Sequence, residues 1–223
     1  MEQILKKAMD RGQKSLSEYE SKAVIKSAGV AVTRELLARS REEAAAFASD
    51  IGYPVALKGC AGTLAHKTEA GVVKLNLTSA EAVRDAYDEI TGRVQEMDGV
   101  LVQEMIRGSR EFVIGLTRDP QFGPCVMFGI GGIFTEAMKD VSFRVAPLTE
   151  EDAEEMIEEI RMKKLLGEIL GSPAVDRSGL VRALVGISDL AVRHSEIAEI
   201  DINPLIIAGD KAIAADALVV LAV

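Results

Sequence analysis

This chain of 223 residues has few histidines, few cysteines and no long apolar run, and each shortage excludes a class of protein. Its two cysteines, Cys60 and Cys125, have neither CxxC spacing nor a cluster of partner residues, so we expect no disulfide and no zinc site. Apolar runs such as residues 124–128 are far shorter than the roughly 20 residues that a membrane helix needs. The first residues do not resemble a signal peptide, which predicts a cytoplasmic protein with no membrane partner.

Basic residues are also fewer than acidic ones. Lys and Arg total 26 against 35 Asp and Glu, which gives a formal net charge of −9. A field of this sign repels polyanions and argues against nucleic acid as a partner. Any phosphate that the protein binds must therefore be neutralised locally or through a metal ion. The 48% of hydrophobic residues is enough for one large domain, or for two small ones that share a cleft.

The first hundred residues alternate between helix and strand signals. Helices are expected after Ser17, Ser40 and Ser79, because each serine can cap the exposed N–H groups of a first turn. Short strands are expected at residues 54–58 and 72–77, where apolar residues are bounded by glycine or proline. This half of the chain should form a unit that ends near residue 100.

The sequence pattern of the second half is typical of an antiparallel sheet. Three strand candidates joined by turn-rich segments predict a meander, and the chain closes with a hairpin that turns at Gly209-Asp210. Helices are expected after Thr149 and Ser178. The expected strands are residues 100–106, 110–118, 124–128, 141–146, 198–208 and 211–220.

His66 is one of only two histidines and lies in a glycine-punctuated loop between two strand candidates. Imidazole can be neutral, nucleophilic and transiently charged near pH 7, and a loop held by strands is a place where such a group can meet a ligand. The alternative is a solvated surface residue, which is the commoner fate of a loop histidine. The other histidine, His194, is interpreted as the end residue of a helix.

The closing hairpin predicts a metal site. If residues 208 and 211 flank a two-residue turn, the register puts Asn203 opposite Asp216, and Asp201 points to the same face. Oxygen ligands at this spacing suit one hard cation such as Mg²⁺. The alternative is that the residues before Pro204 only cap a strand end, with the proline disturbing the register.

Other candidates for ligand binding lie on strands and turns. With a turn at residues 108–109, Glu104 and Glu111 become diagonal neighbours on one sheet face, where a ribose, a metal or Lys58 would relieve their repulsion; otherwise both face water. Lys58 ends a buried strand, so its ammonium group must find a phosphate or reach solvent. The glycines of residues 129–132 form either a backbone anion site or an ordinary turn.

Several separate segments together resemble the ATP-grasp (beta) subunit of ADP-forming acetyl-CoA or acyl-CoA synthetases, relatives of succinyl-CoA synthetase. The resemblance runs from about Ser17 to Leu221. The most specific segments are residues 53–58, 64–76, 115–124, 127–136, 140–148 and 201–204. Ala70-Gly71 departs from the two glycines that the family often has there.

The resemblance implies an α/β (α+β) ATP-grasp fold in which two α/β subdomains clamp ATP or ADP. We expect one subdomain at residues 20–100 and the other at 1–19 plus 101–223. By position, His66 is the phosphohistidine that relays phosphate to ADP. Nucleotide would be bound by Lys58, Glu104, Glu111, Gly131 and Gly132, and Mg²⁺ by Asn203, Asp216 and Asp201.

A partner chain is also implied, because nothing here resembles a CoA site. We expect a CoA-binding alpha subunit in an α2β2 heterotetramer. Two other functions remain open at this point: a nucleotide-sensing ATP-grasp module without turnover, and a stand-alone carboxylate–amine ligase of the same superfamily. Neither needs His66, and the acyl group, the choice of ATP or GTP and the direction of reaction do not follow from the residues.

Overall fold

The computed structural model describes residues 1–61, 71–94, 97–132, 140–169 and 171–222. The chain divides into two compact units. A large unit consists of Met1–Ser15, Glu20–Val32 and Arg107–Val223, and a small unit consists of Leu16–Tyr19 and Thr33–Ile106. These boundaries differ from the expected ones. The last strand of the small unit extends past residue 100, and the segment at residues 20–32 belongs to the large unit.

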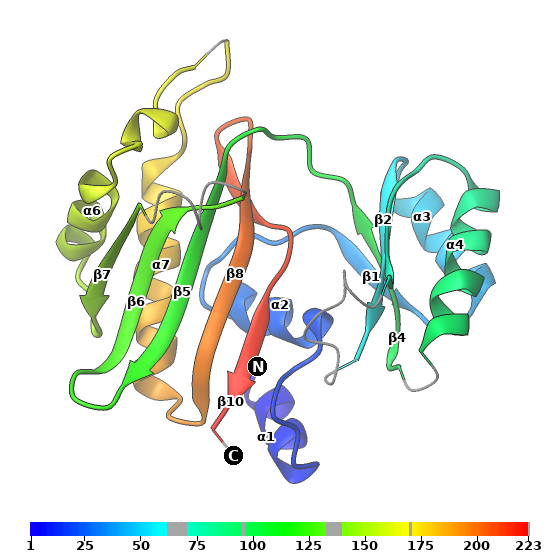
Figure 1. The fold of residues 1–223 in the computed structure, drawn as a ribbon, viewed down its shortest axis with the longest axis horizontal. Coiled ribbons are helices and arrows are strands. Elements are labelled where there is room, and N and C mark those ends of the chain that lie inside the picture. Colours follow the sequence, from blue (N-terminus) through cyan, green and yellow to red (C-terminus); the bar gives the residue numbers. More distant parts are fainter. Residues whose placement is uncertain (62–70, 95–96, 133–139, 170, 223) are drawn as a thin grey trace. The chain divides into compact units, whose positions relative to one another are not determined.

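The small unit is an antiparallel four-stranded sheet with two helices on one face (Figure 1). Alternate strand residues such as Val55 and Leu57 pack with the alanine-rich helix face and form its hydrophobic core. The strand order is β1 (Glu35–Ala38), β4 (Gly99–Glu104), β2 (Val55–Cys60) and β3 (Val73–Leu77), and the helices are α3 (Arg41–Ile51) and α4 (Ala80–Arg93).

The helices of the small unit begin where the sequence predicts. Ser40 accepts a hydrogen bond from the backbone N–H of Glu43 at 3.2 Å, and Ser79 accepts one from Ala82 at 3.2 Å. Each hydroxyl satisfies one of the N–H groups that a first turn leaves without a partner. Gly52 ends α3 at a φ of 96°, in the region that favours glycine.

The large unit contains an antiparallel six-stranded sheet (Figure 1). Helices α6 (Glu150–Glu159) and α7 (Arg177–Arg193) cover one face, where Phe112 and Phe128 stack with ring centroids 5.5 Å apart. The strands run in the order β10 (Leu218–Leu221), β8 (Ile197–Ala208), β5 (Glu111–Asp119), β6 (Gly123–Ile130) and β7 (Val141–Val145), with β9 (Lys211–Ala214) also paired to β8. The remaining elements are α1 (Glu2–Asp10), α2 (Glu18–Ser27) and the short 3₁₀ helix η1 (Lys163–Leu166).

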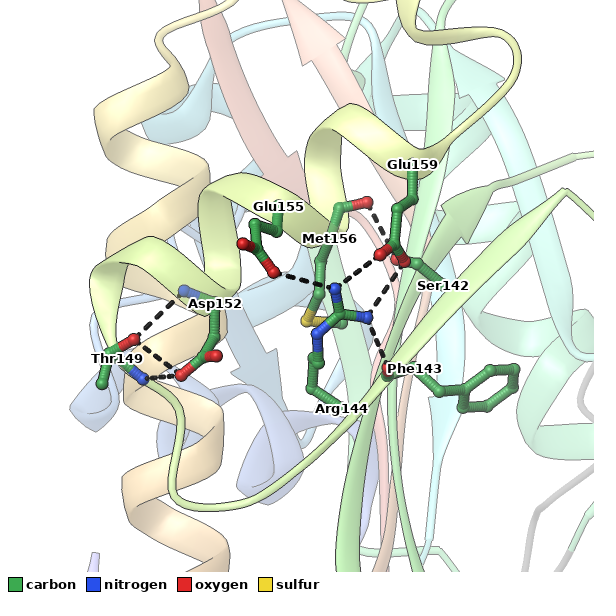
Figure 2. Close-up of polar contacts among 8 residues, drawn as sticks. All are labelled: Ser142, Phe143, Arg144, Thr149, Asp152, Glu155, Met156 and Glu159. Atoms are coloured by element: carbon green, nitrogen blue, oxygen red, sulfur yellow. Dashed lines mark hydrogen bonds and ion pairs between the residues drawn. The ribbon is translucent and has the colours of Figure 1, made fainter.

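Helix α6 is bound to strand β7 by ion pairs and a hydrogen bond, and a capping box closes its first turn (Figure 2). Thr149 and Asp152 form a capping box at the start of α6. The sequence predicted the helix start at Thr149 but not the role of Asp152. The guanidinium of Arg144 donates to Glu159 at 3.0 Å and to Glu155 at 3.2 Å. The hydroxyl of Ser142 donates to the carbonyl of Met156 at 2.9 Å.

Buried Arg110 connects segments of the large unit that are far apart in the sequence. Its guanidinium donates to four backbone carbonyls, those of Leu165, Gly167, Pro173 and Gly209, at 3.0–3.1 Å. The segment between η1 and α7 is thereby held to the turn of the β8–β9 hairpin.

Two sequence predictions about elements are wrong, and two elements were not predicted. The first pairing of the predicted meander is wrong, because β4 pairs with β1 and β2 in the small sheet and β5 lies beside β8 in the large one. The second pairing, between β5 and β6, is confirmed. Helix α7 is capped by Asp176, whose carboxylate accepts from the N–H of Gly179 at 3.1 Å, and not by Ser178. Helix α1 and strand β1 were not anticipated.

No helix among the described residues is both long enough and apolar enough to cross a lipid bilayer.

Candidate functional site

Lys58 lies on the face of the small sheet that α3 and α4 do not cover. Its neighbours Val55 and Leu57 point into the helix-covered core, so strand alternation turns Lys58 and Cys60 to the other side. Only 7% of Lys58 is exposed, and its Nζ donates to Oε1 of Glu18 at 2.7 Å. The prediction that Lys58 could reach solvent is therefore wrong. The predicted phosphate contact remains a prediction, and the Glu18 carboxylate is one observed partner.

Cys60 shares this environment with the segment that carries Glu18. Burial raises the pKa of its thiol, while hydrogen bonds from the Tyr19 backbone and the Ser17 hydroxyl oppose the shift, and the charges of Glu18 and Asp98 add to it. A thiol with a raised pKa is a poor nucleophile. Cys60 is accordingly a buried packing residue.

Glu104 ends β4 and is held by Arg34. The carboxylate accepts from the Arg34 backbone N–H at 2.7 Å and from its Nε at 2.8 Å. The predicted sharing of one sheet face with Glu111 is wrong, because Glu104 lies opposite Val55 in the small sheet and Glu111 lies opposite Ile206 in the large one. Neither spacing nor composition pointed to Arg34.

Glu111, Gly131 and Gly132 do come together. The N–H of Gly131 donates to the carbonyl of Glu111 at 2.8 Å. Gly132 has a φ of 71°, and a Cβ at this position would lie 2.7 Å from Oε2 of Glu111. The carboxylate therefore occupies the space that a side chain at residue 132 would need, which ties the turn to the first residue of β5.

The closing hairpin follows the predicted register. Ala208 pairs with Lys211, and the same register holds on both sides of the metal candidates, with Leu205 opposite Ala214 and Asp201 opposite Leu218. Residues 215–217 leave the ladder between these pairs. Asn203 and Asp216 therefore stand at the same level of the hairpin without forming a ladder pair.

The acidic groups of this hairpin influence one another. Desolvation raises the pKa of the Asp201 carboxyl group, and the negative charges of Asp216 and Glu199 raise it further. Carboxylates that disfavour each other's charge gain from a nearby cation. The described residues contain no group of three or more His, Cys, Asp or Glu side chains arranged around a metal. Carboxylate and amide oxygens are of the type that magnesium prefers, and Asp201, Asn203 and Asp216 as its ligands remain a prediction.

A depression of about 260 Å³ in the large sheet is lined in part by Asp201. One row of paired residues crosses it, running from Leu218 through Asp201, Gly115 and Met127 to Phe143. A Cβ at Gly115 would lie 3.0 Å from Met127 Cε, so glycine keeps this floor open. No sequence pattern pointed to these apolar residues, because their contact depends on pairing between strands that are far apart in the sequence.

The two histidines have different outcomes. His66 and its predicted role lie outside the described residues. His194 ends α7 as predicted, and its Nδ1 lies 2.9 Å from Oε1 of Glu196.

Comparison with known proteins places the fold and the site in context. Residues 7–221 match the family model described as an ATP-grasp domain, and the chain belongs to that family. The beta subunit of the acetate–CoA ligase (ADP-forming) I of Pyrococcus furiosus is 42% identical over 225 residues, covering 98% of this chain and 97% of the relative. Within the ATP-grasp family, the chain thus belongs to the beta subunits of ADP-forming acetate–CoA ligases.

Solved structures agree with this assignment. The dinucleotide forming acetyl-coenzyme A synthetase 1 of Ca. Korarchaeum cryptofilum, in complex with coenzyme A, Ca-AMPCP and HgCl⁺, has 46% identity and a TM-score of 0.93, with 99% of both chains covered. In another structure of that protein, with coenzyme A and Mg-AMPPCP, a phosphohistidine segment points towards the nucleotide binding site. That structure has 46% identity and a TM-score of 0.87, again over 99% of both chains.

Proposed function

We propose that this chain is the nucleotide-binding subunit of an ADP-forming acyl-CoA synthetase, an acid–thiol ligase, and that it transfers phosphate between His66 and ADP. The observation that carries the proposal is the similarity, over 99% of the chain, to a synthetase whose phosphohistidine segment points towards bound nucleotide. The buried Lys58 and the acidic hairpin supply the charges that such a transfer needs.

Each group has a defined role in the transfer. The lone pair of an imidazole nitrogen of His66 attacks the γ-phosphorus of ATP, and ADP leaves with the electrons of the broken P–O bond. The reverse step transfers the phosphoryl group from His66 to ADP and regenerates neutral imidazole. Lys58 offsets phosphate charge, and Glu104, Glu111, Gly131 and Gly132 contact the remaining parts of the nucleotide.

Asp201, Asn203 and Asp216 would hold the magnesium ion. When bound, the ion neutralises phosphate charge and favours an in-line arrangement. Asp201 and Asn203 lie on β8, whose register is set by its partners, and Asp216 lies in the segment between β9 and β10.

A partner must supply the rest of the reaction. We propose that a CoA-binding alpha subunit forms the acyl phosphate and exchanges phosphate with His66 in an α2β2 assembly. The term beta subunit in the name of the P. furiosus relative, and the coenzyme A in the Korarchaeum structures, support a partner of this kind.

Labelling with γ-³²P-ATP and magnesium tests the transfer. The wild-type chain should acquire acid-labile, base-stable label, as expected of a phosphohistidine. The His66→Asn variant should acquire none, while the His194→Asn variant, which changes the only other histidine, should label normally. Label that persists in His66→Asn would refute the transfer.

A further inference from the structure

Strand β7 is an end strand of the large sheet, and its outer edge has no strand partner among the described residues. Two hydrogen bonds bracket its pairing with β6. The N–H of Ile130 donates to the carbonyl of Asp140 at 3.2 Å, and the N–H of Ala146 donates to the carbonyl of Pro124 at 2.8 Å. In an antiparallel ladder, alternate residues exchange such bonds, and the residues between them point their backbone groups away. Even-numbered residues of β7 therefore bond to β6, and odd-numbered ones face the outer edge.

Phe143 is the middle one of the three β7 residues whose backbone groups face this edge, between Val141 and Val145. The side chains of Phe143 and Val145 are 52% and 48% exposed, whereas the intervening Ser142 side of the strand is buried. An end strand with exposed apolar side chains and outward N–H and C=O groups is a template for pairing with another chain. The outer edge of β7 thus has the features of an interaction surface.

A second copy of the chain fits this edge by symmetry. When two antiparallel β7 strands meet about a twofold axis at Phe143, each Phe143 N–H faces the carbonyl of the other Phe143. The same register puts Val141 of one copy opposite Val145 of the other. All three side chains lie on one face of the strand, so apolar groups would meet along the whole pair.

Arg144 occupies the acceptor that this pairing would use. Its Nη1 donates to the carbonyl of Phe143 at 3.0 Å (Figure 2). The same guanidinium donates to Glu159 at 3.0 Å and to Glu155 at 3.2 Å, two carboxylates one turn apart on α6. The Arg144 side chain is only 25% exposed. Helix α6 therefore holds a charged donor against the central outward carbonyl of the strand.

We propose that Arg144 keeps the outer edge of β7 closed to a second copy of the chain. Pairing requires the guanidinium to leave the Phe143 carbonyl, and the two carboxylates of α6 oppose that movement. A charged side chain on an end strand is one of the means by which proteins avoid pairing edge to edge. The inference is independent of the proposed function, because it uses no residue of the nucleotide or metal site.

Sedimentation equilibrium of the full chain tests this between about 10 µM and about 1 mM, where exposed strand edges associate. The weight-average mass of Arg144→Met should rise with concentration towards twice that of wild type, which should stay constant. Arg177→Met is the matched control and should behave as wild type. Arg177 also donates to two glutamates of α6, Glu154 at 3.1 Å and Glu158 at 2.6 Å, but to no strand carbonyl in the described part of the chain.

A second substitution identifies the edge that associates. Adding Phe143→Lys to Arg144→Met places like charges opposite each other in the symmetric pair and should restore the constant mass. Arg144→Gln repeats the test if circular dichroism shows that Arg144→Met is unfolded, and the same rise is expected. A constant mass in the folded Arg144 variant, an equal rise in Arg177→Met, or a rise that Phe143→Lys does not reverse would overturn the inference.

Discussion

At the scale of single residues, the contacts of charged groups depend on partners far away in the sequence. Lys58 meets a carboxylate forty positions earlier, and Glu104 meets an arginine seventy positions earlier. A buried strand lysine predicts that a partner exists, but local sequence does not say which residue it is. The residue types of the candidate site could thus be predicted, whereas their partners required the fold.

Gly132 gives a residue-scale prediction. Gly132→Ala should destabilise the protein, because a left-handed φ costs a non-glycine residue about 1–2 kcal/mol and the new Cβ would also meet Glu111. The matched control is Gly209→Ala, where φ is 64° and a Cβ would meet nothing within 4 Å. Urea unfolding followed by circular dichroism should show a larger loss of unfolding free energy for Gly132→Ala than for the control.

The excess over the control should come from Glu111. Combining Gly132→Ala with Glu111→Ala removes the atoms that crowd the new Cβ. Relative to Glu111→Ala alone, the double variant should therefore lose only as much unfolding free energy as Gly209→Ala loses relative to wild type. If the excess persists without the Glu111 carboxylate, the crowding explanation is incorrect.

At the scale of elements, helices and hairpins were predictable and the sheet partners of single strands were not. Serine caps and the two-residue turn at Gly209-Asp210 act over a few residues, so Ser40, Ser79 and the hairpin register agree with prediction. Residues 107–110 look like a hairpin turn, yet they lead from one sheet to the other. The pairing of β4 is decided by distant strands, which leave no local trace in the sequence.

The attachment of α6 to β7 should weaken in acid. The hydrogen bond from Arg144 lowers the pKa of Glu159 below its ordinary 4.5. A lowered folded pKa means that the pair's stabilisation is fully present above the unfolded pKa and is lost as pH falls through the folded one. Glu159→Gln should therefore lower Tm at pH 7 by only about 1–3 °C, since the pair is exposed, and by nothing once Glu159 is protonated.

Scanning calorimetry of wild type and Glu159→Gln, from pH 7 down through the pKa of Glu159, measures the effect on Tm. Glu168→Gln serves as the control, because it removes the same charge from an exposed position outside the helix. The difference in Tm between wild type and Glu159→Gln should shrink towards acid pH. A difference that stays constant with pH would mean that the ion pair contributes nothing to α6.

At the scale of the whole molecule, ligand binding should raise the unfolding free energy and Tm. A ligand that binds only the folded state at a hundred times its Kd adds about 2.7 kcal/mol, or about 5–10 °C in Tm for a chain of this size. Mg-ADP should produce such a rise, and removal of magnesium with EDTA should reduce it. Calorimetry suits the measurement because the chain has no tryptophan.

The magnesium-dependent part of this rise should depend on the hairpin carboxylates. Asp216→Asn should abolish most of it, because the variant removes one of the two charges proposed to hold the ion. Asp210→Asn removes an exposed carboxylate from the turn of the same hairpin and should leave the rise unchanged. Equal responses in the two variants would place the magnesium ion elsewhere.

The position of β8 in the large sheet has a consequence for the order in which the protein can fold during synthesis. All strands of the small sheet precede residue 107, whereas β5 lies between β6 and β8, a strand that begins only at Ile197. Until the ribosome has released that strand, one edge of β5 has no neighbour to pair with, and Arg110 lacks the carbonyl of Gly209. The small unit can therefore be finished while the large one still exposes an open strand edge, the feature of a nascent chain most prone to pairing with the wrong partner.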